Sequence, residues 1–119
     1  MDRTAYFALD SNALPWEQRS NPHLPAPLFR KVLHTDAETG VFFQLVRYPR
    51  GVINPSHTHP CAHAIYVLEG TLVTHRGRYG PGAFVWFPEG EVMAHGAGTD
   101  GDVTPLLVSN KPFAIQNVG

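Results

Sequence analysis

The stretch from His57 to Gly70 reads HTHPCAHAIYVLEG, and its second half has the pattern of a β-strand. Residues 64–68 (AIYVL) form a short apolar run with β-branched and aromatic side chains, which is typical of a buried strand. The Glu69-Gly70 pair that follows is a turn signal. The residues before the run are extended chain that Pro60 interrupts. The stretch therefore predicts a strand that is entered through a bend.

Similar runs lie on both sides, separated by turn clusters rich in glycine and proline. Residues 41–48 (VFFQLVRY) and 83–87 (AFVWF) predict two further strands. Shorter strands are expected at 31–34, 71–75, 92–95, 103–109 and 113–118. From residue 31 onward no segment carries the roughly 3.6-residue period of a helix. Strands joined by short turns predict an all-β sandwich or barrel, formed by residues 31–119.

Residues 1–30 differ from this pattern, because they hold several prolines and show no sustained periodicity. We expect an extended N-terminal arm, with a short strand near residues 6–9 and apolar side chains such as Trp16 and Phe29 that dock it. Two interpretations stay open. The arm wraps around its own domain, or it crosses onto a second subunit. The arm and the apolar strands together lead us to expect a homodimer.

The composition limits the possible functions. With 119 residues, 43% hydrophobic and 16% charged, the chain fits one folded domain. The formal net charge of -1 argues against partners held by a basic field, namely nucleic acid or an anionic membrane surface. No apolar run approaches the roughly 20 residues of a membrane helix, and the N-terminus lacks the pattern of a signal peptide. The single cysteine, Cys61, favours a reducing, cytoplasmic location.

Three histidines, His57, His59 and His63, fall within seven residues. They share one parity, so in an extended chain they point to the same side. Neighbours on one side of a strand lie roughly 7 Å apart, and two imidazoles at that spacing reach one ion. Pro60 bends the chain between His59 and His63, which brings the third ring round.

A structural explanation of these histidines is weaker than a metal site. A single histidine on an apolar strand is usually packed and hydrogen-bonded. Three that converge need proton donors when neutral and repel one another when charged. A metal ion resolves both problems because it binds neutral rings. The pattern favours a site for one divalent transition metal ion.

The spacing of these histidines resembles the first motif of the cupins. That motif reads G, five residues, H-x-H, three or four residues, E, six residues, G. Gly51, His57, His59, His63 and Gly70 stand at these spacings, with His63 in place of the family's glutamate.

The second cupin motif is matched less closely. It reads G, five residues, P-x-G, two residues, H, three residues, N. Gly82 and residues 88–90 (PEG) fit it, whereas His95 comes two residues later than usual and Thr99 stands at the asparagine position. The resemblance covers about residues 40–110 and implies a small antiparallel jelly-roll β-barrel.

The resemblance implies that His57, His59 and His95 are metal ligands and that His63 is the fourth. Four neutral imidazoles leave the double charge of a divalent ion uncompensated, whereas a carboxylate would cancel one unit of it. Alternatively, His63 does not bind, and three histidines leave coordination positions open, as catalytic sites do. Glu91, four residues before His95, is a candidate catalytic base. A solvated loop acid is the alternative interpretation of Glu91.

Three functions follow as hypotheses. The resemblance to cupins with all-histidine sites implies a metal-dependent dioxygenase that acts on a small carbonyl or enolisable compound. It implies Fe(II) as the favoured ion, with Zn, Ni or Mn as alternatives. The alternative is a non-catalytic module that binds a metal and a small ligand, as a sensor or regulatory domain. A metal-independent isomerase or epimerase needs fewer histidines than the sequence provides. Aromatic residues on the flanking strands favour a small-molecule ligand in each case.

Overall fold

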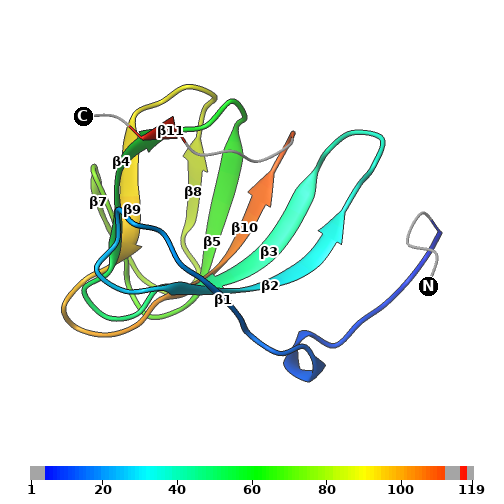
Figure 1. Ribbon diagram of the computed structural model, residues 1–119, viewed down its shortest axis with the longest axis horizontal. Coiled ribbons are helices and arrows are strands. Elements are labelled where there is room, and N and C mark those ends of the chain that lie inside the picture. Colours follow the sequence, from blue (N-terminus) through cyan, green and yellow to red (C-terminus); the bar gives the residue numbers. More distant parts are fainter. Residues whose placement is uncertain (1–4, 112–115, 118–119) are drawn as a thin grey trace.

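A computed structural model describes residues 5–111 and 116–117 and contains two antiparallel sheets (Figure 1). The six-stranded sheet has the order β1 (Glu17–Arg19), β2 (Leu28–Thr35), β3 (Phe42–Arg47), β10 (Thr104–Ser109), β5 (His63–Glu69) and β8 (Phe84–Phe87). The five-stranded sheet has the order β11 (Gln116–Asn117), β4 (Ile53–Thr58), β9 (Met93–Ala97), β6 (Leu72–Thr74) and β7 (Gly77–Tyr79). The predicted all-β jelly-roll fold is confirmed.

Most predicted strands are present, with ends shifted by a few residues. The strand expected near residues 6–9 is wrong, because residues 6–10 have no regular secondary structure. A short 3-10 helix, η1 (Ser11–Ala13), and β1 follow instead. The strand expected at 113–118 lies partly outside the described residues, and its described part, Gln116–Asn117, is β11. Within the described residues, no helix is long and apolar enough to cross a bilayer.

The core lies between the two sheets. Strand β5 shows the alternation that builds it, since Ile65 and Val67 are fully buried while Tyr66 and Leu68 are exposed. Side chains of the other sheet, such as Leu72 of β6, complete the same cluster. Alternate residues of a strand face opposite sides, so this pattern fixes which side chains line the interior.

The N-terminal segment packs on the outside of the six-stranded sheet of its own chain. The ring of Trp16 lies 4.6 Å from Nζ of Lys31 and 4.8 Å from the guanidinium carbon of Arg47. Lys31 also donates a hydrogen bond of 2.9 Å to the carbonyl oxygen of Ser11. These cation–π contacts confirm the docking role expected of Trp16.

Strands β4 and β9 approach each other unusually closely beside the histidines. A Cβ atom on Gly96 of β9 would lie 2.3 Å from the carbonyl oxygen of Val52 and 2.6 Å from Cα of Ile53. Farther along the same pair, the register shifts between Asn54 and His57. In a regular strand, Asn54 and His57 would point to opposite sides, because they are three positions apart. The irregularity allows both side chains to be buried.

Candidate metal centre

Four histidines from both sheets meet in the interior. His57 lies on β4, His59 follows that strand, His63 begins β5 and His95 lies on β9. Each is at most 1% exposed. The ring centroids of His57 are 4.7 Å from those of His59 and 4.9 Å from those of His95. His63 lies 4.7 Å from His59 and 6.0 Å from His95, measured in the same way.

Three of the four form a group that could hold a metal ion. One ring nitrogen from each of His57, His59 and His95 lies within 4.8 Å of the other two. His63 is outside this group, although its ring is adjacent. The structure therefore brings together all four histidines singled out in the sequence, and groups three of them tightly. Coordination by His63 stays a prediction.

The His57 ring is held by its own strand. Its Nδ1 lies 2.6 Å from the carbonyl oxygen of Pro55, which can only accept a hydrogen bond. Nδ1 therefore carries the proton, and Nε2 carries a lone pair. That Nε2 is buried and has no hydrogen-bond partner in the part of the chain that the structure describes.

The His95 ring is held across the barrel by Tyr48. The Tyr48 hydroxyl oxygen lies 3.0 Å from Nδ1 of His95, and both residues are buried. Burial raises the pKa of the Tyr48 phenol above its ordinary value, so the hydroxyl stays neutral. Nε2 of His95, like that of His57, is buried without a hydrogen-bond partner among the described residues. Metal binding through Nε2 requires that Nδ1 donates to Tyr48.

These contacts fit the requirements of a metal ion. Ligating histidines generally use one nitrogen for the metal and donate the other N–H to a carbonyl or similar acceptor, which fixes the ring. Pro55 and Tyr48 provide such contacts for His57 and His95. The sequence contains no local signal for the contact between Tyr48 and His95, because the two residues lie far apart in the chain.

Burial among apolar neighbours favours the neutral form of three of these rings. Phe87 of β8 stacks on His63 with 4.9 Å between ring centroids and lies 5.7 Å from His95. Burial, followed by repulsion from the neighbouring histidines, lowers the pKa of His63 to about 3 and that of His95 well below its ordinary value. Burial also lowers the pKa of His57, against the opposing effect of its bond to Pro55. Neutral imidazole is the form that binds metals.

The lowered pKa of His63 predicts that the metal-free protein is destabilised by mild acid. In the unfolded chain, His63 binds a proton once the pH falls below about 6.5, whereas in the folded chain it stays neutral down to its lowered pKa. The contribution of neutral His63 to the free energy of unfolding is therefore complete above pH 6.5, and it is lost as the pH falls towards 3. For His63 alone, the free energy of unfolding should fall by about 2 kcal/mol between pH 7 and pH 5. Urea denaturation of chelator-treated protein at both pH values measures the change.

A His63→Leu variant provides the matched control for this measurement. It should lose less stability than the parent chain over the same pH interval, because one buried titrating ring is gone. Equal pH dependence of the two proteins would contradict the assignment to His63.

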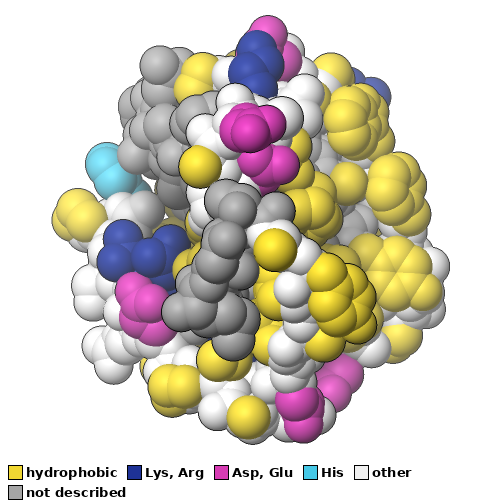
Figure 2. Space-filling model, turned by 90° about the vertical axis from the view of Figure 1, so that its right-hand side faces the viewer, with side chains coloured by type: hydrophobic (Ala, Val, Ile, Leu, Met, Phe, Trp, Pro, Cys, Tyr) yellow, Lys and Arg dark blue, Asp and Glu magenta, His cyan; other side chains and the backbone are white. Residues whose placement is uncertain are grey.

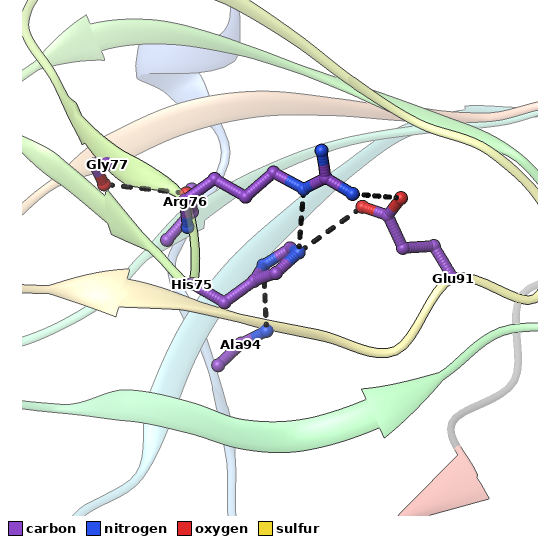
Figure 3. A network of polar contacts seen from close by, with 6 residues as sticks. His75, Arg76, Gly77, Glu91 and Ala94 are labelled. Atoms are coloured by element: carbon purple, nitrogen blue, oxygen red, sulfur yellow. Dashed lines mark hydrogen bonds and ion pairs between the residues drawn. The ribbon is translucent and has the colours of Figure 1, made fainter.

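Glu91 lies in a polar network with Arg76 and His75 (Figure 3). Its carboxylate accepts a hydrogen bond of 3.1 Å from Nη2 of Arg76, and its other oxygen lies 3.3 Å from Nε2 of His75. Nδ1 of His75 is 3.5 Å from the backbone N–H of Ala94, the residue before His95. Glu91 is therefore engaged with two cationic or polar side chains, and its action as a base stays a prediction.

Two buried amides lack a hydrogen-bond partner at their side-chain oxygen. Gln44 on β3 and Asn54 on β4 are 5% and 3% exposed, and neither Gln44 Oε1 nor Asn54 Oδ1 is hydrogen-bonded within the described chain. Asn54 is the cross-strand partner of His95, which places the two side chains next to each other. A buried carbonyl oxygen without a donor is costly, so such groups are candidates for contact with water or a ligand. Nothing in the sequence pattern predicted either amide.

The closed pair of sheets and the histidines that converge within it define a cupin. Within this superfamily, the chain belongs to the family of ChrR cupin-like domains, whose model matches residues 4–114. A search of curated proteins gives no significant match.

Several solved structures share the fold. A candidate acetylacetone dioxygenase from Methylibium petroleiphilum is 10% identical, with a TM-score of 0.82 and coverage of 100% of this chain and 85% of the other. The polyketide cyclase RemF from Streptomyces resistomycificus is 21% identical, with a TM-score of 0.80 and coverage of 97% and 87%. A chain in the complex of Rhodobacter sphaeroides SigE with the anti-sigma ChrR is 21% identical, with a TM-score of 0.66 and coverage of 82% and 50%. At these identities the likeness establishes the fold alone.

Proposed function

We propose that this protein is a metal-dependent dioxygenase that acts on a small carbonyl or enolisable compound. The observation that carries the proposal is the group of three buried histidines, His57, His59 and His95. Three imidazole ligands leave coordination positions for other molecules, as catalytic sites do. The candidate acetylacetone dioxygenase with the same fold supports this choice of chemistry.

The ion is proposed to be Fe(II), with Zn, Ni or Mn as alternatives. When bound, such an ion would acidify an enolisable compound and bring O2 alongside it. A 1,3-diketone and O2 would give a carboxylic acid and a 1,2-dicarbonyl compound, which accounts for all atoms without an external reductant.

The protein's own residues would orient and desolvate the reactants. Pro55 and Tyr48 hold the two rings whose Nε2 atoms face the cluster. Phe87 provides an apolar wall and excludes water. We further propose that Gln44 and Asn54 accept hydrogen bonds from hydroxyl or enol groups of the ligand, since their amide oxygens lack donors. Glu91 is the candidate base for removing the enolic proton.

Oxygen consumption tests this function. Fe(II)-loaded protein is expected to take up O2 in proportion to added 2,4-pentanedione or to a member of a hydroxyketone panel, because the ion and substrate meet in one site. His57→Ala should abolish the uptake, whereas His23→Ala, which alters an exposed histidine, should retain it. An absence of uptake across the panel, by protein shown to hold one iron per chain, would contradict the proposal.

The second candidate function is a non-catalytic metal- and ligand-binding module. The family match to ChrR cupin-like domains and the fold shared with a chain of the SigE–ChrR complex favour it. In that case a protein partner would receive the signal, and His63 would close a four-histidine sphere around zinc. Elemental analysis of the native protein separates the two functions: iron supports the enzyme, and zinc that is lost on His63→Ala supports the module.

A further inference from the structure

The outer surface of the six-stranded sheet is covered by the N-terminal segment at its β2 end and is exposed at its β8 end. Directly paired residues on neighbouring strands point to the same side, so cross-strand rows can be traced over this surface. One row runs from β2 to β8 through Lys31, Leu45, Leu106, Tyr66 and Phe84. A second row runs in the same direction through His34, Phe43, Val108, Ala64 and Trp86.

The N-terminal segment covers the β2 end of both rows. Trp16 packs over Lys31 at the start of the first row. Phe7 packs on His34 at the start of the second row, with 5.0 Å between ring centroids. The chain therefore buries this end of the surface with its own residues.

The β8 end of the rows is exposed and apolar. Four neighbouring side chains form what we call the aromatic face: Tyr66 (43% exposed), Leu68 (44%), Phe84 (64%) and Trp86 (54%). Tyr66 and Phe84 are cross-strand partners, and Leu68 and Trp86 are the next outward residues of the same two strands. Figure 2 shows hydrophobic side chains, several of them rings, gathered on the right of the view with few charged groups among them. Strand β8 is an edge strand of its sheet.

We propose that the aromatic face is the surface through which two copies of this chain associate. Large aromatic side chains bury roughly 150–250 Å² each, so four half-exposed residues offer on the order of 400 Å² per copy. Specific interfaces need about 1,000 Å² in total. Two aromatic faces supply most of that area, and the partly exposed Leu106 and Val108 beside them extend it.

Charge favours a second copy over a polyanion or a charged peptide. The aromatic face holds no ionisable group other than the Tyr66 hydroxyl, so it offers no positive charge to a phosphate or a carboxylate. The net charge of -1 per chain produces little repulsion between two copies. A two-fold axis places the same patch on both sides of an interface, which suits a surface made of rings and a leucine.

Sedimentation velocity over about a hundredfold dilution series tests this interface on the full chain. The wild-type protein is expected to sediment as a dimer that dissociates on dilution. Trp86→Arg should raise the dissociation constant by about 30-fold or more, because a buried central tryptophan is a typical hot spot. Val92→Arg is the matched control, since Val92 is 49% exposed but lies outside the aromatic face, and it should remain dimeric.

A fluorescence measurement keeps the test independent of how well Trp86→Arg folds. In a Trp16→Phe chain, Trp86 is the single tryptophan, and its emission, excited at a wavelength that tyrosine does not absorb, should shift to longer wavelength on dilution as the ring becomes solvated. A wild-type protein that stays monomeric over the whole series would overturn the proposal and leave the face for another protein. A dimer that Trp86→Arg does not weaken, or an emission maximum independent of concentration, would overturn it too.

Discussion

Replacing His95 with alanine is expected to lower the affinity for a divalent transition metal by about 100-fold or more. Loss of a residue that only orients a ligand typically costs 10–100-fold, and His95 is predicted to be a ligand itself. Its buried Nε2, lacking a hydrogen-bond partner within the described residues, is the atom that the variant removes. Competition against a chromophoric chelator measures the affinity, and circular dichroism establishes that the variant is folded.

Two further variants make this prediction specific. His23→Ala removes an exposed histidine and should leave the affinity unchanged. His63→Ala should have a smaller effect than His95→Ala, because His63 is outside the group of three. Equal metal binding by His95→Ala and the parent chain would disprove the metal centre, and equal losses for His63 and His95 would establish a four-histidine sphere.

Gly96→Ala is expected to destabilise the protein by about 3 kcal/mol or more and to weaken metal binding as well. The new methyl group would lie 2.3 Å from a backbone oxygen and 2.6 Å from a backbone carbon of the adjacent segment, so β4 must move away from β9. These two strands carry His57 and His95. Urea denaturation measures the stability, and chelator competition measures the metal affinity.

A second glycine substitution, Gly80→Ala, is the control for Gly96→Ala. A Cβ atom on Gly80 would meet no atom within 4 Å, so Gly80→Ala should change the stability by no more than about 0.5 kcal/mol. If Gly96→Ala proves as stable as Gly80→Ala, the close approach of β4 and β9 is not rigid. The position of His95 would then not depend on it.

The strands and the four histidines could be predicted because both depend on local patterns. Alternation of apolar residues marks a strand, and shared parity places His57 and His59 on one side. The bend expected at Pro60 is also present, since His63 begins a strand of the opposite sheet. The spacing of His57, His59 and His63 was thus sufficient to predict that their rings lie near one another.

Contacts between distant residues could not be predicted in this way. Tyr48, which follows β3, meets His95 of β9 only because the two sheets face each other across the interior. Glu91 meets Arg76 and His75 because a hairpin and a loop converge. Such pairings depend on the register and twist of the sheets, which single-sequence patterns do not contain. The strand expected near residues 6–9 failed for a related reason, since this segment packs by single rings such as Phe7 rather than by strand pairing.

The shifted register between Asn54 and His57 has a consequence for how this chain can vary. The irregularity lets both residues turn inward, although ordinary alternation would send them to opposite sides. Deleting or inserting one residue there would rotate the imidazole of His57 out of the barrel, while the sheet itself could still form. Among related chains, the number of residues in this segment should therefore vary less than their chemical identity.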